Sequence, residues 1–82
     1  MTVSAQLSVY PLRQTNLSPA INAVRQRLEA HGLRPEIGAM STRVTSEAEV
    51  VFAALRDAFI RVASDGQVAM TITVSNACPI QG

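Results

Sequence analysis

The side chains best suited to binding chemistry in this 82-residue chain are amides and hydroxyls, rather than acids, bases or thiols. Asn76 offers two hydrogen-bond donors and one acceptor, a set that suits the polar edge of a planar heteroaromatic ring. Tyr10 offers a flat apolar ring with a polar tip, which is useful for stacking. Each residue also has a structural alternative, because asparagine forms turns after strands and tyrosine can close the edge of a sheet or an interface.

No catalytic or metal-binding pattern accompanies these groups. The chain has no glycine-rich phosphate loop, no His-x-x-x-His and no Cys-x-x-Cys. Its one cysteine, Cys78, cannot form an intramolecular disulfide or a multi-cysteine metal site. His31 falls at the expected end of a helix, where its ring interacts with the helix dipole, and no paired carboxylate is predicted near it. We therefore expect no enzyme, no metal and no cofactor.

The charge and the hydropathy of the chain argue against two classes of partner, nucleic acids and membranes. The formal net charge is +1, and the seven basic residues, all arginines, are scattered along the chain. This pattern gives no electrostatic footprint for nucleic acid. No apolar run approaches the roughly 20 residues that span a bilayer, and no signal peptide is visible. We expect a cytoplasmic protein with no membrane or nucleic-acid partner, made of a single domain over residues 1–82.

The first half of the chain reads as a strand followed by a helix. Apolar and polar residues alternate over residues 2–10, as expected for a half-buried strand, and Pro11 ends the alternation. Ser18 suits a helix N-cap and Pro19 the first helical position. The helix then ends at His31 and Gly32, because glycine readily takes a left-handed conformation.

The second half predicts a hairpin, a helix and a last strand. Residues 34–37 and 40–45 read as strands joined by a turn at Gly38 and Ala39. In this register Thr42 and Val44 share one face of the sheet. Residues 46–49, Ser-Glu-Ala-Glu, match a capping box, and an apolar stripe follows that includes Phe52 and Phe59. We expect both rings in the core, with residues 67–75 as the final strand.

Strand-helix-strand repeated twice predicts a ferredoxin-like α+β fold. Its simplest packing is a four-stranded antiparallel sheet in the order 4-1-3-2, with both helices on one face, because this order keeps both crossovers right-handed. The other face then carries small polar side chains and a single charge, Arg43. Such a face suits a second subunit or a neutral ligand, although a Thr- and Ser-rich strand surface exposed to water is the alternative. The fourth strand is an uncharged edge that invites pairing with another chain.

Three segments also carry a resemblance to a known family. Residues 3–12, 37–42 and 74–79 resemble, in this order and spacing, the thiamine-binding (YkoF-like) family. The middle segment is similar to a Gly-Pro-Met-Ser/Gly-Thr pattern, with Ala39 where proline is common. The last segment is similar to a Ser-Asn-Ala-Cys-Pro ending, and residues 49–56 look like the family's second helix.

The resemblance implies a ferredoxin-like fold and assembly into homodimers or homotetramers. It also implies binding of thiamine or its hydroxymethylpyrimidine part near subunit junctions. The ligand-binding residues that it implies lie on the first strand, after the hairpin and at the end of the last strand: Gln6, Ser8, Tyr10, Met40, Ser41, Thr42, Ser75 and Asn76. The alternative is a regulatory or scaffolding oligomer of the same fold without a small ligand of its own.

Overall fold

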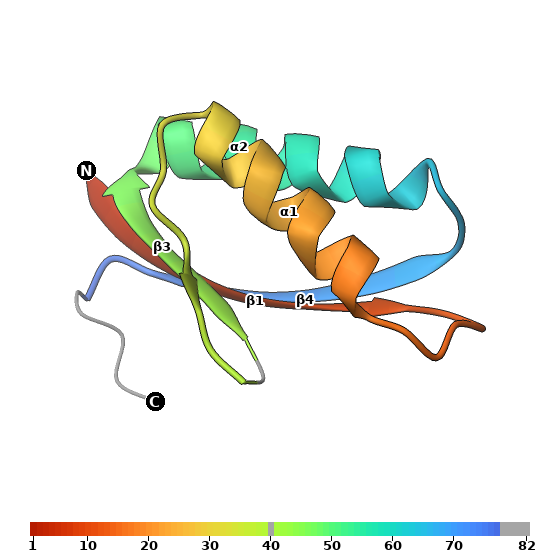
Figure 1. Ribbon diagram of the computed structural model, residues 1–82. Coiled ribbons are helices and arrows are strands. Elements are labelled where there is room, and N and C mark those ends of the chain that lie inside the picture. Colours follow the sequence, from red (N-terminus) through yellow and green to blue (C-terminus); the bar gives the residue numbers. More distant parts are fainter. Residues whose placement is uncertain (40, 78–82) are drawn as a thin grey trace.

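Two helices lie side by side on one face of a four-stranded antiparallel sheet (Figure 1). The structure is a computed structural model, and it describes residues 1–39 and 41–77. The elements follow the order expected from the sequence, so the ferredoxin-like fold is confirmed. They are β1 (Thr2–Pro11), α1 (Ser18–Ala30), β2 (Glu36–Ile37), β3 (Thr42–Glu47), α2 (Ala48–Ala63) and β4 (Val68–Ser75).

The strand order is β2-β3-β1-β4, which is the predicted order read from the other edge. The central strand β1 is ten residues long and pairs with a different neighbour along each edge. It pairs with β4 from Ser4 to Pro11, but with β3 only from Thr2 to Leu7. The last part of β1 therefore has a strand partner on one side only within the described residues. This unequal pairing creates the candidate site.

Two backbone hydrogen bonds show which edge each residue of the sheet faces. The Leu12 N–H donates to the Gln67 carbonyl at 2.9 Å, and the Ala48 N–H donates to the Met1 carbonyl at 2.8 Å. Because bonded pairs alternate in antiparallel sheets, even-numbered residues of β1 bond to β4 and odd-numbered residues bond to β3. The backbone N–H and C=O of Val9 thus point to the side of β1 on which β3 provides no partner beyond Leu7.

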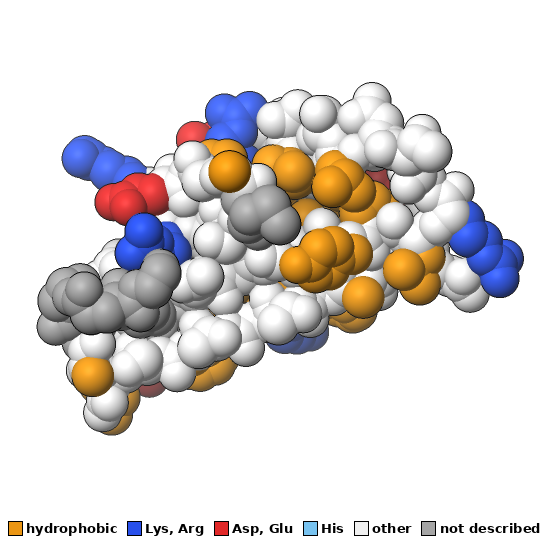
Figure 2. All heavy atoms as spheres, turned by 90° about the horizontal axis from the view of Figure 1, so that it is seen from below, with side chains coloured by type: hydrophobic (Ala, Val, Ile, Leu, Met, Phe, Trp, Pro, Cys, Tyr) orange, Lys and Arg blue, Asp and Glu red, His pale blue; other side chains and the backbone are white. Residues whose placement is uncertain are grey.

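The face of the sheet away from the helices carries mostly small polar side chains, as predicted, but besides Arg43 it bears Glu36 and Glu47, which pair with Arg43 and Thr2. Residues of β3, β1 and β4 form cross-strand rows on it, such as Arg43, Gln6 and Thr73. Figure 2 views this face and shows a largely uncharged surface with the charged side chains mainly toward its margins. Ser4 is buried on it, and its hydroxyl lies 2.9 Å from that of Thr45.

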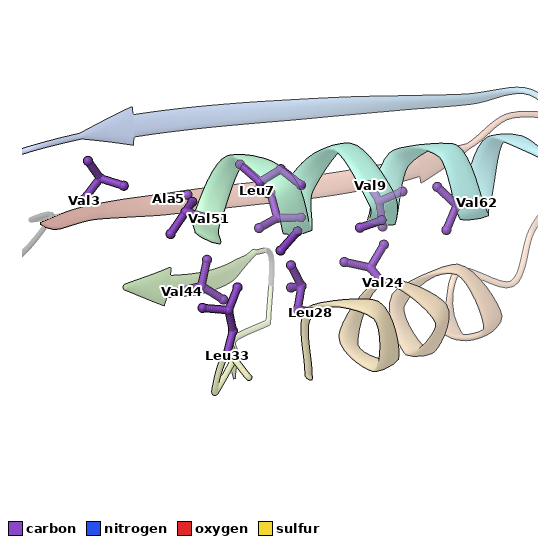
Figure 3. Packing of buried hydrophobic residues seen from close by; sticks show 13 residues of the cluster. Val3, Ala5, Leu7, Val9, Val24, Leu28, Leu33, Val44, Val51 and Val62 are labelled. Atoms are coloured by element: carbon purple, nitrogen blue, oxygen red, sulfur yellow. The ribbon is translucent and has the colours of Figure 1, made fainter. Parts of the chain in front are cut away.

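The core lies between the sheet and the helices (Figure 3). Alternate residues of β1, from Val3 to Val9, point into it, as their period of two predicts. Leu28 of α1 and Val51 of α2 are fully buried against them. Full burial of a side chain of this size stabilises the fold by about 1.5–3 kcal/mol relative to exposure.

Both predicted helix starts are shifted. Helix α1 begins at Ser18 with Leu17 as the N-cap, and the Ser18 N–H donates to Asn16 Oδ1 at 3.1 Å. The predicted capping box at 46–49 is wrong, because β3 runs to Glu47, and Glu47 is the N-cap of α2 without a side-chain cap bond. Strand β3 stays paired with β1 as far as Thr2↔Glu47, so the sheet ladder extends through the residues expected to cap the helix.

The hairpin is also displaced from its predicted place. Strand β2 has only two residues, and the Gly38 N–H donates to the Ser41 carbonyl at 2.8 Å, so the turn lies one residue later than expected. Pro35 precedes β2 and has no N–H to offer a ladder. The predicted facing of the return strand is confirmed, since both Thr42 and Val44 are buried on the helix side.

The prediction that Phe52 and Phe59 belong to the core is wrong. Phe52 is 54% exposed, and Phe59 is exposed as well. Asp57 of α2 contacts α1, and on a helical wheel both rings lie on the opposite flank of α2. The edge strand β4 lies to one side of α2 (Figure 3), and its residue Ile72, which pairs with the core residue Leu7, is likewise exposed. Within the described residues, no further strand or helix lies outside the free edge of β4.

Candidate ligand pocket

A cavity of about 90 Å³ opens next to the start of β3, beside the last residues of β1, which have no partner in β3. Three elements enclose it: the end of β1, the start of α1 and the β2–β3 hairpin. Because it wraps around an uncovered strand edge, residues from both faces of β1 reach it. Its described lining residues are Leu7, Ser8, Val9, Tyr10, Leu17, Ile21, Val24, Ile37, Gly38, Ala39, Ser41 and Thr42.

The apolar wall of the pocket comes from α1. Leu17, Ile21 and Val24 line it at positions i, i+4 and i+7, which fall on one side of a helix. Val24 is buried, whereas Leu17 at the mouth is exposed. The wall continues from the core out to solvent, so an entering apolar group leaves water without displacing a packed side chain.

The polar groups of the pocket are hydroxyls. Tyr10, Ser41 and Thr42 each contribute a hydroxyl-bearing side chain to its lining. The hydroxyl of Ser8 also lines the pocket, although Ser8 already has a polar contact. None of the described lining residues carries a formal charge. A mostly apolar cavity with a few convergent hydroxyls is the usual form of a site for a small, flat ligand.

The structure separates the eight sequence-predicted site residues into groups. Four of them line this pocket: Ser8, Tyr10, Ser41 and Thr42. Met40, a fifth, lies outside the described residues.

The other three residues lie elsewhere on the sheet. Gln6 is half-buried in a cross-strand row on the open face. Ser75 pairs with Ser4, which is four residues or about 13 Å along β1 from Ser8. The Ser75 hydroxyl accepts the Ala77 N–H at 2.9 Å, and the neighbouring Asn76 is exposed. These residues do not belong to the pocket of the same chain.

The apolar wall was missed as a site by the sequence analysis. Ile21 and Val24 have helical spacing, which is equally expected of core residues. Leu17 and Ile37 are the informative pair, since both are large, apolar and exposed at the mouth. They are identified as pocket residues only by the structure, in which β3 begins at Thr42 and leaves the last residues of β1 without a partner on that side. No sequence motif marks this start of β3.

A second, larger cavity of about 400 Å³ has a different character. It lies beside β3 where the short β2 no longer covers it, and its described lining includes Arg34, Glu36 and Arg43. No residue expected from the sequence to bind a ligand lines it. We therefore take the smaller, uncharged pocket as the candidate site.

His31 has a carboxylate partner, contrary to the sequence expectation. Its Nε2 lies 2.9 Å from Asp57 Oδ2, which also accepts hydrogen bonds from Arg27 Nε at 3.0 Å and from the Arg27 terminal nitrogen at 2.7 Å. The hydrogen bonds from Arg27 and then from His31 lower the pKa of Asp57 below its ordinary value. This cluster joins the outer sides of α1 and α2, so its role is to hold the helices together.

The described residues show neither a metal-binding cluster nor a membrane-spanning helix. They contain no group of three or more His, Cys, Asp or Glu side chains placed to hold a metal ion. No helix among them is long and apolar enough to cross a membrane.

The architecture and the pocket define a class, a ferredoxin-like α+β domain with a small uncharged cavity. Sequence comparison makes it specific: the model of the family described as thiamine-binding protein matches residues 5–77, so the chain belongs to that family. The matched range contains the whole described lining of the pocket. No match was found among curated proteins.

Solved structures show the same fold at low sequence identity. A hypothetical protein from Methanocaldococcus jannascii matches with a TM-score of 0.85 and 20% identity, over 98% of this chain and 84% of that one. A domain of unknown function from Bacillus cereus matches with a TM-score of 0.77 and 21% identity, over 95% and 78%. A protein from Thermotoga maritima with a proposed place in thiamine biosynthesis or salvage matches with a TM-score of 0.80 and 14% identity, over 92% and 83%.

Proposed function

We propose that this protein binds thiamine or its hydroxymethylpyrimidine part in the pocket between the end of β1, the start of α1 and the β2–β3 hairpin, and that it works as a homo-oligomer without transforming the ligand. The observation that carries the proposal is the location of the pocket. An uncharged cavity with hydrogen-bonding hydroxyls lies wholly inside the region matched by the thiamine-binding family.

The binding mechanism is burial of one flat ring with its polar edge read by hydroxyls. The ring packs on the α1 wall formed by Leu17, Ile21 and Val24. Ring nitrogens and an exocyclic amino group then meet the hydroxyls of Ser41 and Thr42, which act as donor or acceptor as needed. The cavity is smaller than the roughly 150 Å³ that encloses benzene, so part of the ligand stays at the mouth.

The chemistry of the described lining supports a binding role in this proposal. The described lining residues include no acid, imidazole, amine or thiol to move a proton or attack a bond. Tyr10 is the sole titratable side chain among them, and it lies at the exposed mouth.

Assembly into a homo-oligomer has support from two surfaces. The outer edge of β4 presents the backbone groups of Met70, Ile72 and Val74, and no charged residue lies in this strand. The open face of the sheet has few charged side chains, and these lie mainly toward its margins (Figure 2). Because Ser75 and Asn76 lie far from the pocket of their own chain, in the proposed assembly they reach a bound ligand only from a second copy.

Calorimetric titration with thiamine and with hydroxymethylpyrimidine tests the proposal. We expect saturable binding near one ligand per subunit, weakened about 5- to 10-fold by Thr42→Val, because this change removes one hydrogen-bonding hydroxyl and keeps the side-chain shape. Thr71→Val is the matched control, since Thr71 is exposed on β4 outside the pocket.

Equal weakening by both valine variants would move the site away from this pocket. If a well-folded oligomer binds neither compound, thiamine binding is wrong for this chain, and the scaffolding alternative takes its place.

A further inference from the structure

We infer that the pocket selects the unphosphorylated ligand, so that free thiamine or free hydroxymethylpyrimidine binds and the phosphate ester of either is rejected. This inference rests on the proposed function and adds a selectivity to it. It concerns the charge state of the ligand, which the fold and the family leave open.

The first argument is the charge of the lining. A phosphate ester carries about −1.5 to −2 charges near neutral pH and needs cationic or N–H partners when it leaves water. The described lining supplies hydroxyls and aliphatic groups, and no Arg side chain is among it. The nearest contrast is the second cavity, where Arg34 and Arg43 both contribute. The chain thus has guanidinium groups at a different cavity.

The second argument concerns the start of α1, which borders the pocket through Leu17. A helix N-terminus ordinarily binds phosphate through its free N–H groups. Here the Ser18 N–H already donates to Asn16 Oδ1 at 3.1 Å, and the Ile21 N–H donates to the Leu17 carbonyl at 3.1 Å. Pro19 has no N–H. The Ile21 N–H is thus the first to bond within the helix, and of the three positions before it, 18 to 20, two are closed to an anion.

The third argument is the mouth of the pocket. Tyr10, Leu17 and Ile37 form this mouth and are each between 41 and 47% exposed. These side chains favour a second ring or an alkyl group in the part of the ligand that stays outside. A phosphate held there lies against apolar surface without a described partner, which lowers affinity through lost hydration.

Paired titrations test the selectivity. Thiamine is compared with thiamine monophosphate, and hydroxymethylpyrimidine with its phosphate, because each pair differs by the ester alone. We expect the free compound to bind about tenfold or more tightly in both pairs. Its affinity should change little between low and moderate salt, because no ion pair is formed with the lining.

A designed change of the mouth gives the converse test. Ile37→Lys adds one cation at an exposed position of β2 and should improve phosphate-ester binding relative to the free compound by about 5- to 10-fold. Ile37→Gln is the matched control, since it adds polarity without charge and should leave the ratio of affinities unchanged.

The possible outcomes separate this inference from the proposed function. Equal or tighter binding of the esters to the unmodified protein overturns the selectivity while thiamine-type binding stands. Absence of binding by all four compounds overturns the proposed function itself.

Discussion

At the scale of single residues, the sequence identified the polar half of the candidate site and missed the apolar half. Ser8, Tyr10, Ser41 and Thr42 were expected to bind a ligand, and all four line the pocket. These residues were named through the family resemblance of their segments, because serine and threonine near a turn are readily structural when taken alone. Apolar residues such as Ile21 are ambiguous, since the same spacing serves a core or a pocket wall.

The Asp57 cluster shows a second limit at this scale. Asp57 is 26 residues from His31 and 30 from Arg27 in the chain, and no local pattern connects them. Only the packing of α1 against α2 brings the three side chains together. Because the partners of Asp57 lower its pKa, its carboxylate stabilises the folded state wherever it is ionised.

We expect Asp57→Asn to lower the melting temperature at pH 7, where the carboxylate of the unmodified protein is ionised. A lowered pKa in the folded state means that this stability is fully present above the ordinary pKa of aspartate. It is lost as the pH falls through the folded-state value. The difference between the two proteins should therefore shrink toward acid pH, as measured by thermal melts across a pH series.

Asp65→Asn is the control, because Asp65, in the turn just after α2, makes an exposed i,i+4 pair with Arg61 of α2. It should change the melting temperature less than Asp57→Asn does. A gap between Asp57→Asn and the unmodified protein that stays constant down to strongly acidic pH would contradict the assigned role.

At the scale of elements, the kinds and order of helices and strands were predictable and their ends were not. The two-residue period of β1 and the apolar stripe of α2 extend over enough residues to identify each element. Ends depend on partners: β3 continues to Glu47 because Thr2 pairs with it, although residues 46–49 have the local pattern of a helix cap. Phe52 was misplaced for a related reason, since its exposure follows from β4 being an uncovered edge.

The free edge of β4 leads to a prediction about assembly. In this strand odd-numbered residues bond to β1, so the N–H of Ile72 points outward. Ile72→Pro removes that outward donor and keeps the ladder to β1. We expect this variant to remain folded and to sediment as a smaller species than the unmodified oligomer.

Thr71→Pro is the matched control, because the N–H of Thr71 points toward β1 and its loss breaks the ladder. This variant should lose about 1–3 kcal/mol of stability, because a carbonyl of β1 is left without its donor, and thermal melts will show the loss. If Ile72→Pro folds and sediments like the unmodified protein, the β4 edge is not the interface, and the open sheet face becomes the surface to test.

At the scale of the whole molecule, the stability of the small core and ligand binding in the pocket are coupled, because the two share residues. The core is a single cluster between the sheet and the helices, and Val24 and Leu7 belong to both the core and the pocket lining. A domain of this size buries only about 60% of its unfolded surface, so its stability margin is small. Added contacts at the pocket should therefore have a measurable effect on the stability of the whole fold.

We expect thermal melting to report ligand binding over the entire domain. A ligand at a free concentration of a hundred times Kd stabilises the folded state by about 2.7 kcal/mol. In a domain of 60–100 residues, each kcal/mol shifts the melting temperature by roughly 4–8 °C, so thiamine or hydroxymethylpyrimidine should raise it by about 10–20 °C. Thr42→Val should need a proportionally higher ligand concentration for the same rise, because its Kd is larger. A rise of equal size in Thr42→Val and the unmodified protein at every concentration would show that the ligand binds elsewhere, and no rise at saturating ligand would exclude binding to the folded state.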